Sequence, residues 1–362
     1  MSVRVVGAAL AALILSACAT PKYAPPQQLP SPSPYPPAER PGPSHPAPER
    51  TLSLSTLPGW REDDHASAFS AFQEGCGVSR EPAMAVVCRN ARALGPLGRE
   101  DARRFFEAHF RVEPSAPAGV LTAYFAPEYP ARRRPDAEFS APVRPGPPRG
   151  VTSPAPDRTQ IETAPANDAL AWMRPEDLFF LQIQGSGVLT LEDGRRMKAL
   201  YQANNGLPFV PIANTMRDRG LLARDNTSGE AIRAWLRDNR GPAADAVMRL
   251  NPRYVFFRLA PDDGRQPVGA ANVPLPSGRA IAVDPSFHTY GELHWIDAEA
   301  PVLRGAFPTY RRLVMALDTG GAIKGHVRAD LYLGLGPAAG AEAGRVRHTL
   351  RMHRLVPRGQ GQ

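Results

Sequence analysis

The sequence predicts a fold that is mainly β with some α, in which short strands alternate with glycine turns, a pattern that favours a barrel. Short apolar runs follow one another through the C-terminal third, where we expect strands at residues 254–259, 280–283, 292–296 and 313–317. A hairpin is expected where residues 188–191 and 196–200 flank Asp193-Gly194, a dipeptide typical of tight turns.

Helical patterns are fewer. Apolar residues recur with helical spacing at residues 64–73 and 99–110. Residues 227–230 (Thr-Ser-Gly-Glu) match a capping box, which predicts that a helix begins there. Residues 168–173 are expected to form one or two helical turns that stop at Pro175.

Two further strands are expected, at residues 119–125 and at residues 178–184, where the run Leu-Phe-Phe-Leu-Gln-Ile-Gln is strongly apolar. The polar, proline-rich residues 126–166 are expected to cross the surface as a long loop. Cys76 and Cys88 form an even pair that suits a disulfide in an oxidising compartment, and two buried free thiols fit the sequence equally well.

The composition allows one or two compact domains in 362 residues, with 43% hydrophobic and 22% charged residues, as in ordinary globular proteins. The formal net charge of +8 suits an anionic polymer or surface. The longest basic run is Arg132-Arg133-Arg134, without interleaved aromatic residues, so we expect no nucleic-acid partner.

The N-terminus has the form of a secretory signal. Arg4 precedes an apolar run at residues 5–15 that is too short to span a bilayer, and the run ends in Leu-Ser-Ala-Cys at residues 15–18. This ending resembles the lipobox of bacterial lipoproteins, which implies that Cys18 is lipidated and becomes the first mature residue. Ala19 favours sorting to the outer membrane, facing the periplasm. The alternative is an ordinary signal peptide with an incidental Cys.

Residues 18–50 follow as a tether, because residues 21–50 contain twelve prolines and cannot bury a core. A recognition site for a proline-binding partner is the other interpretation of this segment. The sequence indicates no specific envelope protein as a partner.

The densest candidate for chemistry is Asp318, which an apolar strand delivers onto the Gly320-Gly321 turn, with Asp330 twelve residues later. Two neighbouring carboxylates can be held in different protonation states, and glycoside cleavage needs a proton donor at the leaving oxygen. Asp318 also fits a turn residue that bonds to its own backbone. Asp-Thr-Gly is the aspartic-protease motif too, but that chemistry needs a second copy, which the sequence lacks.

Two glycine-rich motifs contain these Asp residues. Residues 318–325 read Asp-Thr-Gly-Gly-Ala-Ile-Lys-Gly, and residues 330–336 read Asp-Leu-Tyr-Leu-Gly-Leu-Gly. Both motifs resemble those of the membrane-bound lytic murein transglycosylase A family, and further similar motifs occur in the family's order at residues 121–127, where Ala123 replaces the usual Gly, and at residues 182–187 (Gln-Ile-Gln-Gly-Ser-Gly). Others are at residues 201–206, which depart from the family pattern at Ala203 or Asn204, and at residues 251–257.

The resemblance implies a double-psi β-barrel, formed by residues 51–125 and 253–357, with a smaller β-rich domain inserted at residues 126–252 and a substrate groove between them. It implies cleavage of the β-1,4 bond between N-acetylmuramic acid and N-acetylglucosamine in peptidoglycan, with 1,6-anhydro ends. Asp330 falls on the catalytic position, as general acid and then base, and Asp318 on a second acid lining the site.

Seven other residues are expected to bind the glycan, although each also suits a structural or solvated role: Thr122, Tyr124, Gln182, Gln184, Ser186, Asn205 and Lys324. No cofactor is expected, and no metal, because the eight His show no zinc-type spacing, with His288 and His294 six residues apart. The alternatives are a barrel that binds peptidoglycan without cutting it and a hydrolase that admits water.

Overall fold

The computed structural model describes residues 52–113, 117–147, 155–300 and 307–359. The expected signal peptide, Cys18 and the whole of the expected tether lie outside these residues. Within them, no helix is long and apolar enough to cross a membrane.

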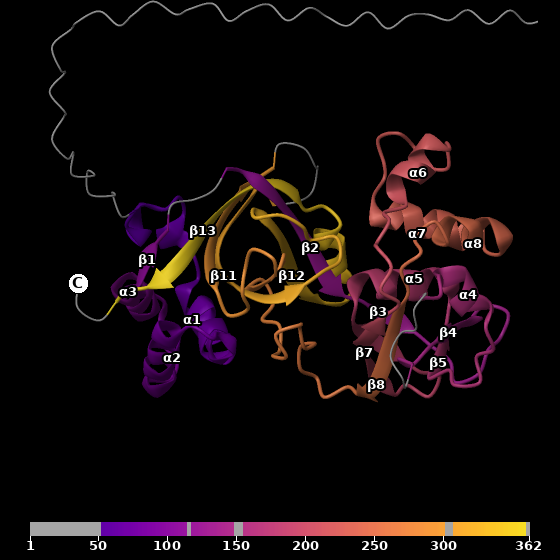
Figure 1. Cartoon of the computed structure of the whole chain (residues 1–362), viewed down its shortest axis with the longest axis horizontal. Coiled ribbons are helices and arrows are strands. Elements are labelled where there is room, and N and C mark those ends of the chain that lie inside the picture. The colour runs from indigo at the N-terminus through magenta and orange to yellow at the C-terminus, as the bar shows by residue number, and fades with distance from the viewer. Residues whose placement is uncertain (1–51, 114–116, 148–154, 301–306, 360–362) are drawn as a thin grey trace, which may run out of the picture. The chain divides into compact units, whose positions relative to one another are not determined.

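The centre of the fold is a closed barrel, in which six strands follow the order β13-β10-β11-β9-β12-β2 and β2 pairs back onto β13 (Figure 1). The pairs β2·β12 and β9·β11 are parallel, and the other pairs are antiparallel. The short β1 (Phe110–Val112) extends the sheet along β13. The barrel strands are β2 (Gly119–Ala126), β9 (Ala280–Val283), β10 (Leu293–Glu299), β11 (Thr309–Thr319), β12 (Arg328–Leu335) and β13 (Arg347–Pro357).

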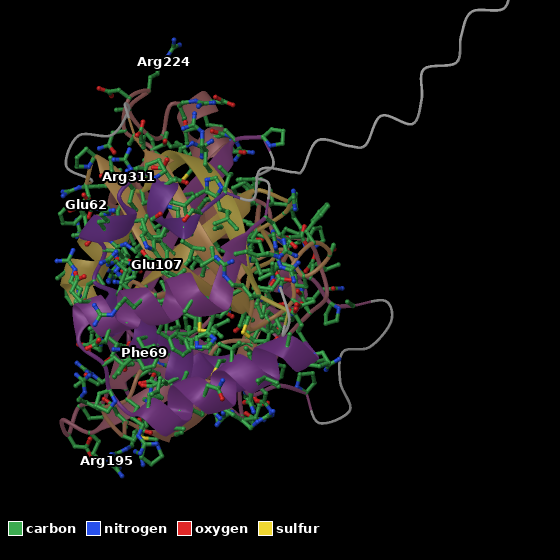
Figure 2. All side chains as sticks on the ribbon, turned by 90° about the vertical axis from the view of Figure 1, so that its left-hand side faces the viewer. Glu62, Phe69, Glu107, Arg195, Arg224 and Arg311 are labelled. Carbon is green, nitrogen blue, oxygen red and sulfur yellow. A yellow bond between two sulfur atoms is a disulfide. The ribbon has the colours of Figure 1, made fainter. Side chains whose placement is uncertain are left out.

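One buried cluster takes side chains from all six barrel strands: Leu121, Ile281, Ile296, Val314, Leu331 and Leu350. Because side chains alternate along a strand, the neighbouring positions face outward, where a second cluster forms against the N-terminal helices. These helices are α1 (His65–Gly75), α2 (Pro82–Leu94) and α3 (Arg99–His109). Phe69, labelled in Figure 2, is fully buried there, with its ring 4.9 Å from that of Phe105. A disulfide joins Cys76 to Cys88.

The chain leaves the barrel after β2 and builds a second region before it returns at β9. A four-stranded sheet runs in the order β3 (Glu128–Pro130), β6 (Gly187–Thr190), β7 (Arg196–Asn204) and β8 (Val255–Pro261). β4 (Ala141–Val143) pairs with β5 (Ala171–Met173). Because β8 pairs with β7, residues 255–261, which the sequence assigned to the barrel domain, belong to the sheet of the insert.

The helices of the insert are α4 (Arg158–Thr163), α5 (Pro175–Gln184), α6 (Ala213–Asp218), α7 (Gly229–Asp238) and α8 (Pro242–Met248). One helix, α5, packs on the sheet of the insert, and the other side of α5 joins a second buried cluster with α6, α7 and α8, which includes Met216 and Leu236. In the C-terminal part, α9 (Gly336–Ala343) follows β12 directly.

The mainly β fold with a barrel and the hairpin at β6 and β7 are confirmed. Three expectations for single elements are wrong. Residues 178–184 form the body of α5 rather than a strand, and residues 171–173 form β5 where helical turns were expected. Residues 126–166 contain β3, β4 and α4, and are not a continuous loop.

The sequence does contain signals for α5. Pro175 occupies the first turn, where its missing N–H is harmless, and Glu176 and Asp177 suit the positive end of the helix dipole. Gly185 ends the helix in the left-handed region, with φ of 84°. A segment that is buried on several sides shows no helical period in its apolar residues. Here the residues at the two ends of the segment are therefore the better indication of a helix.

Candidate active site

Asp318 on β11 and Asp330 on β12 are both in register with Ala282, on the strand that lies between them. Because neighbouring strands lie about 4.8 Å apart, the Cα atoms of the two Asp residues are about 10 Å apart. A bulge in β11 between Ala316 and Asp318 sets this register. A bulge adds one residue to one strand and so changes the face on which the next side chain lies. Both carboxylates line the same cavity.

Asp330 is held through Thr122, its register partner on the parallel strand β2. The Thr122 hydroxyl donates a hydrogen bond to Asp330 Oδ1. Arg328 Nη2 donates to Thr122 Oγ1 at 2.9 Å, so the hydroxyl hydrogen is left for Asp330. Burial raises the pKa of Asp330 and the nearby Asp318 charge adds to this rise, while the Thr122 hydrogen bond and the Arg328 charge oppose it.

Asp318 has a donor on each oxygen. Tyr124 donates its hydroxyl to Oδ2 at 2.7 Å, and the backbone N–H of Ala270 donates to Oδ1 at 2.9 Å. Burial raises the pKa of Asp318, and these two hydrogen bonds work against that rise because they favour the carboxylate. Each carboxylate oxygen of Asp318 therefore accepts a hydrogen bond from the protein.

The cavity has a volume of about 260 Å³. The barrel contributes its carboxylates together with Thr122, Tyr124 and Arg328, and the region of the insert contributes Gln182, Gln184, Arg253 and Val255. A second cavity of about 500 Å³ shares many of these residues and extends to Ser186, Tyr201 and Arg258. Together they form a continuous groove between the barrel and the insert, which suits an extended ligand.

Three of the predicted binding residues hold the lining of the groove in place through hydrogen bonds to the backbone, and one of these bonds joins the insert to the barrel. Gln184 Oε1 accepts the backbone N–H of Phe125 at 3.2 Å, which ties α5 to β2. Gln182 donates to the backbone oxygen of Val255 at 3.3 Å. Ser186 Oγ accepts from the backbone N–H of Tyr201 at 3.4 Å. With Thr122 and Tyr124, five of the seven predicted binding residues line the groove.

The structure does not bring Asn205 and Lys324 to this groove. Asn205 is fully buried, and its amide donates to the oxygens of Pro156 and Pro252 and accepts from the N–H of Tyr254. Such a set of backbone bonds fits a structural role. Lys324 is largely exposed, and its ammonium lies 3.7 Å from an Asp284 oxygen.

Sequence reasoning missed Arg328, although a signal was present. Arg328 precedes Asp330 by two residues on one strand, so the two side chains lie on the same face. It also missed Ala270, whose contribution is a backbone N–H that no motif records. Arg253 lines both cavities and offers the groove a positive charge beside the Gly320-Gly321 turn.

Comparison with known proteins agrees with this arrangement. Residues 120–258 match the model described as the MltA specific insert domain, and residues 279–356 match the 3D domain. The membrane-bound lytic murein transglycosylase of Agrobacterium tumefaciens is 31% identical, with a TM-score of 0.72 over 85% of this chain and 97% of that one. The chain belongs to the MltA family.

Three other relatives are also similar to this chain. The lytic transglycosylase LtgG of Burkholderia pseudomallei is 34% identical, with a TM-score of 0.61 over 85% of this chain and 95% of that one. MltA of Escherichia coli, solved with bound chitohexaose, is 27% identical, with a TM-score of 0.66 over 82% of this chain and 90% of that one. Membrane-bound lytic murein transglycosylase A of Vibrio cholerae is 33% identical over 65% of both chains, so the match spans just under two thirds of that relative.

Proposed function

We propose that this MltA-family chain is a lytic transglycosylase that cleaves peptidoglycan glycan strands between N-acetylmuramic acid and N-acetylglucosamine and leaves 1,6-anhydro ends. The observation that carries the proposal is the unequal pairing of the two carboxylates. Among the described residues, Asp318 has a donor on both oxygens, whereas Asp330 has one only on Oδ1. Asp330 thus has an oxygen available for a proton that faces substrate.

In the first step, Asp330 acts as the general acid. Its raised pKa favours the protonated form, and the Thr122 hydroxyl marks Oδ1 as the accepting oxygen, so the proton resides on Oδ2. Asp330 gives this proton to the oxygen that bridges the two sugars while the bond from C1 to that oxygen breaks. The N-acetylglucosamine side leaves as an alcohol.

In the second step, the Asp330 carboxylate acts as the base. It takes the proton from the C6 hydroxyl of the muramic acid residue while that oxygen forms a bond to C1. The ring closes internally, no water is consumed, and Asp330 is again protonated. Asp318, held by Tyr124 and Ala270, stabilises the positive charge that develops at C1 after the first bond to oxygen breaks and before the second one forms.

The groove supports a polymeric substrate. Its wall combines apolar surface at Ile183 and Val255 with hydroxyl and amide groups at Ser186 and Gln184, a mixture that suits sugar faces and their hydroxyl and acetamido substituents. The bound chitohexaose in E. coli MltA is an oligosaccharide in a relative with the same fold, which supports a glycan as the occupant here. The net charge of +8 suits an acidic wall polymer.

The resemblance of residues 15–18 to a lipobox supports attachment to the outer membrane through acylated Cys18, on the periplasmic side where the wall lies. The proline-rich residues 18–50 then separate the enzyme from the lipid surface. The relatives are named membrane-bound, which agrees with this placement.

The test is the identity of the products. The full chain and its Asp330→Asn variant are incubated with purified peptidoglycan, and soluble fragments are identified by mass. We expect fragments lighter than hydrolytic products by one water molecule, and none from the variant. Reducing ends would assign a hydrolase, and wall binding by both proteins without release would assign a binding module.

A further inference from the structure

A second cluster of reactive side chains lies away from the groove, at the turn between β9 and β10. His288, Glu292 and His294 are all buried, with exposed fractions of 6%, 8% and 1%. One nitrogen from each His and one carboxylate oxygen lie within 4.8 Å of one another. None of the three lines either cavity, so the catalytic scheme leaves them unexplained.

The hydrogen bonding of His288 leaves the lone pair of its Nδ1 facing the Glu292 carboxylate. Its Nε2 lies 2.7 Å from the backbone oxygen of His326, an acceptor, so Nε2 carries a hydrogen. In the neutral ring Nδ1 is then unprotonated, and it lies 3.2 Å from Glu292 Oε2. Two acceptors at this distance need a positive charge between them, either a proton or a metal ion.

His294 lacks a hydrogen-bond partner. Its Nε2 lies 3.2 Å from the same Glu292 Oε2, but without the alignment of a hydrogen bond. Neither ring nitrogen of this fully buried side chain therefore makes a hydrogen bond within the described residues. A buried polar group without a hydrogen bond destabilises the fold, so a ligand for Nε2 would remove part of that penalty.

The outer contacts resemble those that orient metal ligands, which are usually hydrogen-bonded on their far side. The His326 carbonyl fixes the His288 ring. On Glu292, Oε1 accepts the Thr289 hydroxyl at 3.0 Å and pairs with Arg354 Nε at 3.4 Å. The other oxygen, Oε2, is left to face the two imidazoles.

Two of the three distances between the ligand atoms also fit a metal site, and the third, between the two nitrogens, is at most 4.8 Å. Zinc binds His nitrogen and carboxylate oxygen at about 2.0–2.2 Å, so tetrahedral ligand atoms lie about 3.3–3.5 Å apart. Glu292 Oε2 lies 3.2 Å from the near nitrogen of each imidazole. Arg354 opposes a cation, but it is also 3.3 Å from Glu113 and 3.9 Å from Glu81, which compensate its charge.

The geometry points to a binding site for one divalent transition-metal ion of the zinc type, held by His288 Nδ1, Glu292 Oε2 and His294 Nε2, with water as the fourth ligand. The three ligands line neither cavity, so the role we assign to the ion is to hold this turn rather than to contact substrate. The backbone groups of Gly291 and Glu292 hydrogen-bond to Ala316 on β11, two residues before Asp318, so the ion anchors the turn beside a catalytic strand.

The experiment uses the purified full chain, stripped with a chelator and titrated with zinc chloride by calorimetry, with bound zinc counted by mass spectrometry. We expect one zinc per chain and a higher melting temperature with zinc. Glu292→Gln and His294→Gln should weaken binding by about 100-fold or more, and Thr289→Val, which removes an outer contact, by about 10-fold. His326→Gln is the matched control, because it removes a neighbouring exposed imidazole and keeps the carbonyl.

The proposal is overturned if the stripped chain shows no saturable zinc binding, or if Glu292→Gln and His294→Gln bind zinc as tightly as the unmodified chain. Loss of binding in His326→Gln with retention in Glu292→Gln overturns it as well. Melting curves without zinc check that each variant folds. Should His294→Gln fail to fold, Glu292→Gln carries the test alone, and cobalt absorption on the unmodified chain reports whether nitrogen and oxygen ligands bind the ion.

Discussion

Thr122→Val separates the proposed acid from the residues that orient it. The change removes the hydroxyl that donates to Asp330 Oδ1 and accepts from Arg328, while the β-branched shape of the side chain is kept. A hydrogen bond to a charged group contributes about 1.5–3 kcal/mol. If that energy is realised only in the transition state, kcat/KM falls by about 10- to 150-fold.

The pH profile should change as well. The Thr122 hydrogen bond lowers the pKa of Asp330 against the stronger effect of burial, so its removal raises that pKa further. The first step needs protonated Asp330, and activity is lost as pH rises through its pKa. The alkaline limb of kcat/KM should therefore move to higher pH in Thr122→Val.

Thr319→Val is the matched control. Thr319 lines the same cavity, but its hydroxyl donates to the backbone oxygen of Val283 at 2.9 Å and contacts neither carboxylate. Initial rates of fragment release from purified peptidoglycan, measured across pH for both variants, give the comparison. An unshifted alkaline limb in Thr122→Val, or an equal loss of rate in Thr319→Val, refutes the role assigned to Thr122.

Three further predictions concern stability. Burial raises the pKa of Asp318, so ionisation of this residue destabilises the fold as pH rises through that pKa. Near neutral pH, Asp318→Asn should therefore have a higher melting temperature than the unmodified chain. This difference should vanish below the ordinary Asp pKa of about 4. Replacing Cys76 and Cys88 with Ala opens a loop with a sequence separation of 12 and should lower the unfolding free energy by about 3 kcal/mol in denaturant titrations, and reduction of the unmodified chain should give the same midpoint. Gly119→Ala places a Cβ 1.7 Å from a backbone oxygen of the turn before β12, so it should lower the melting temperature clearly, whereas Gly98→Ala, with open space around its Cβ, should not.

The prediction of structure succeeded where short apolar runs were bounded by turn residues, even without a clear period. Residues 280–283 alternate little because β9 is buried on both faces, yet their β-branched, apolar character still identified the strand. The same character misled at residues 178–184, since α5 packs against both the sheet and the helices of the insert and is apolar on more than one side. Burial on several faces erases the period that distinguishes the two structures.

For the site, motif positions identified both carboxylates, but spacing along the chain did not identify which neighbours would meet them. Asn205 and Lys324 belong to the same motifs as groove residues, and their backbone positions turn them away from it. The contact of Glu292 with His288 and His294 was not predicted, although the three residues lie within one short segment, because the conformation of the turn after β9 decides whether they meet.

The strand β2 supplies a hydrogen-bond donor to each of the two carboxylates. Thr122 and Tyr124 are two residues apart on β2, so their side chains lie on one face, and one donates to Asp330 while the other donates to Asp318. A shift of β2 along its axis would therefore disturb both acids together rather than either one alone.

The insert takes part in holding that strand. The Gln184 side chain, at the end of α5, accepts the backbone N–H of Phe125, the residue directly after Tyr124. α5 in turn carries Gln182, which binds the backbone of Val255 on β8. The insert thus does more than line the groove: through Gln184 it fixes the end of β2, and through β2 it is linked to Thr122 and Tyr124, the donors of both carboxylates.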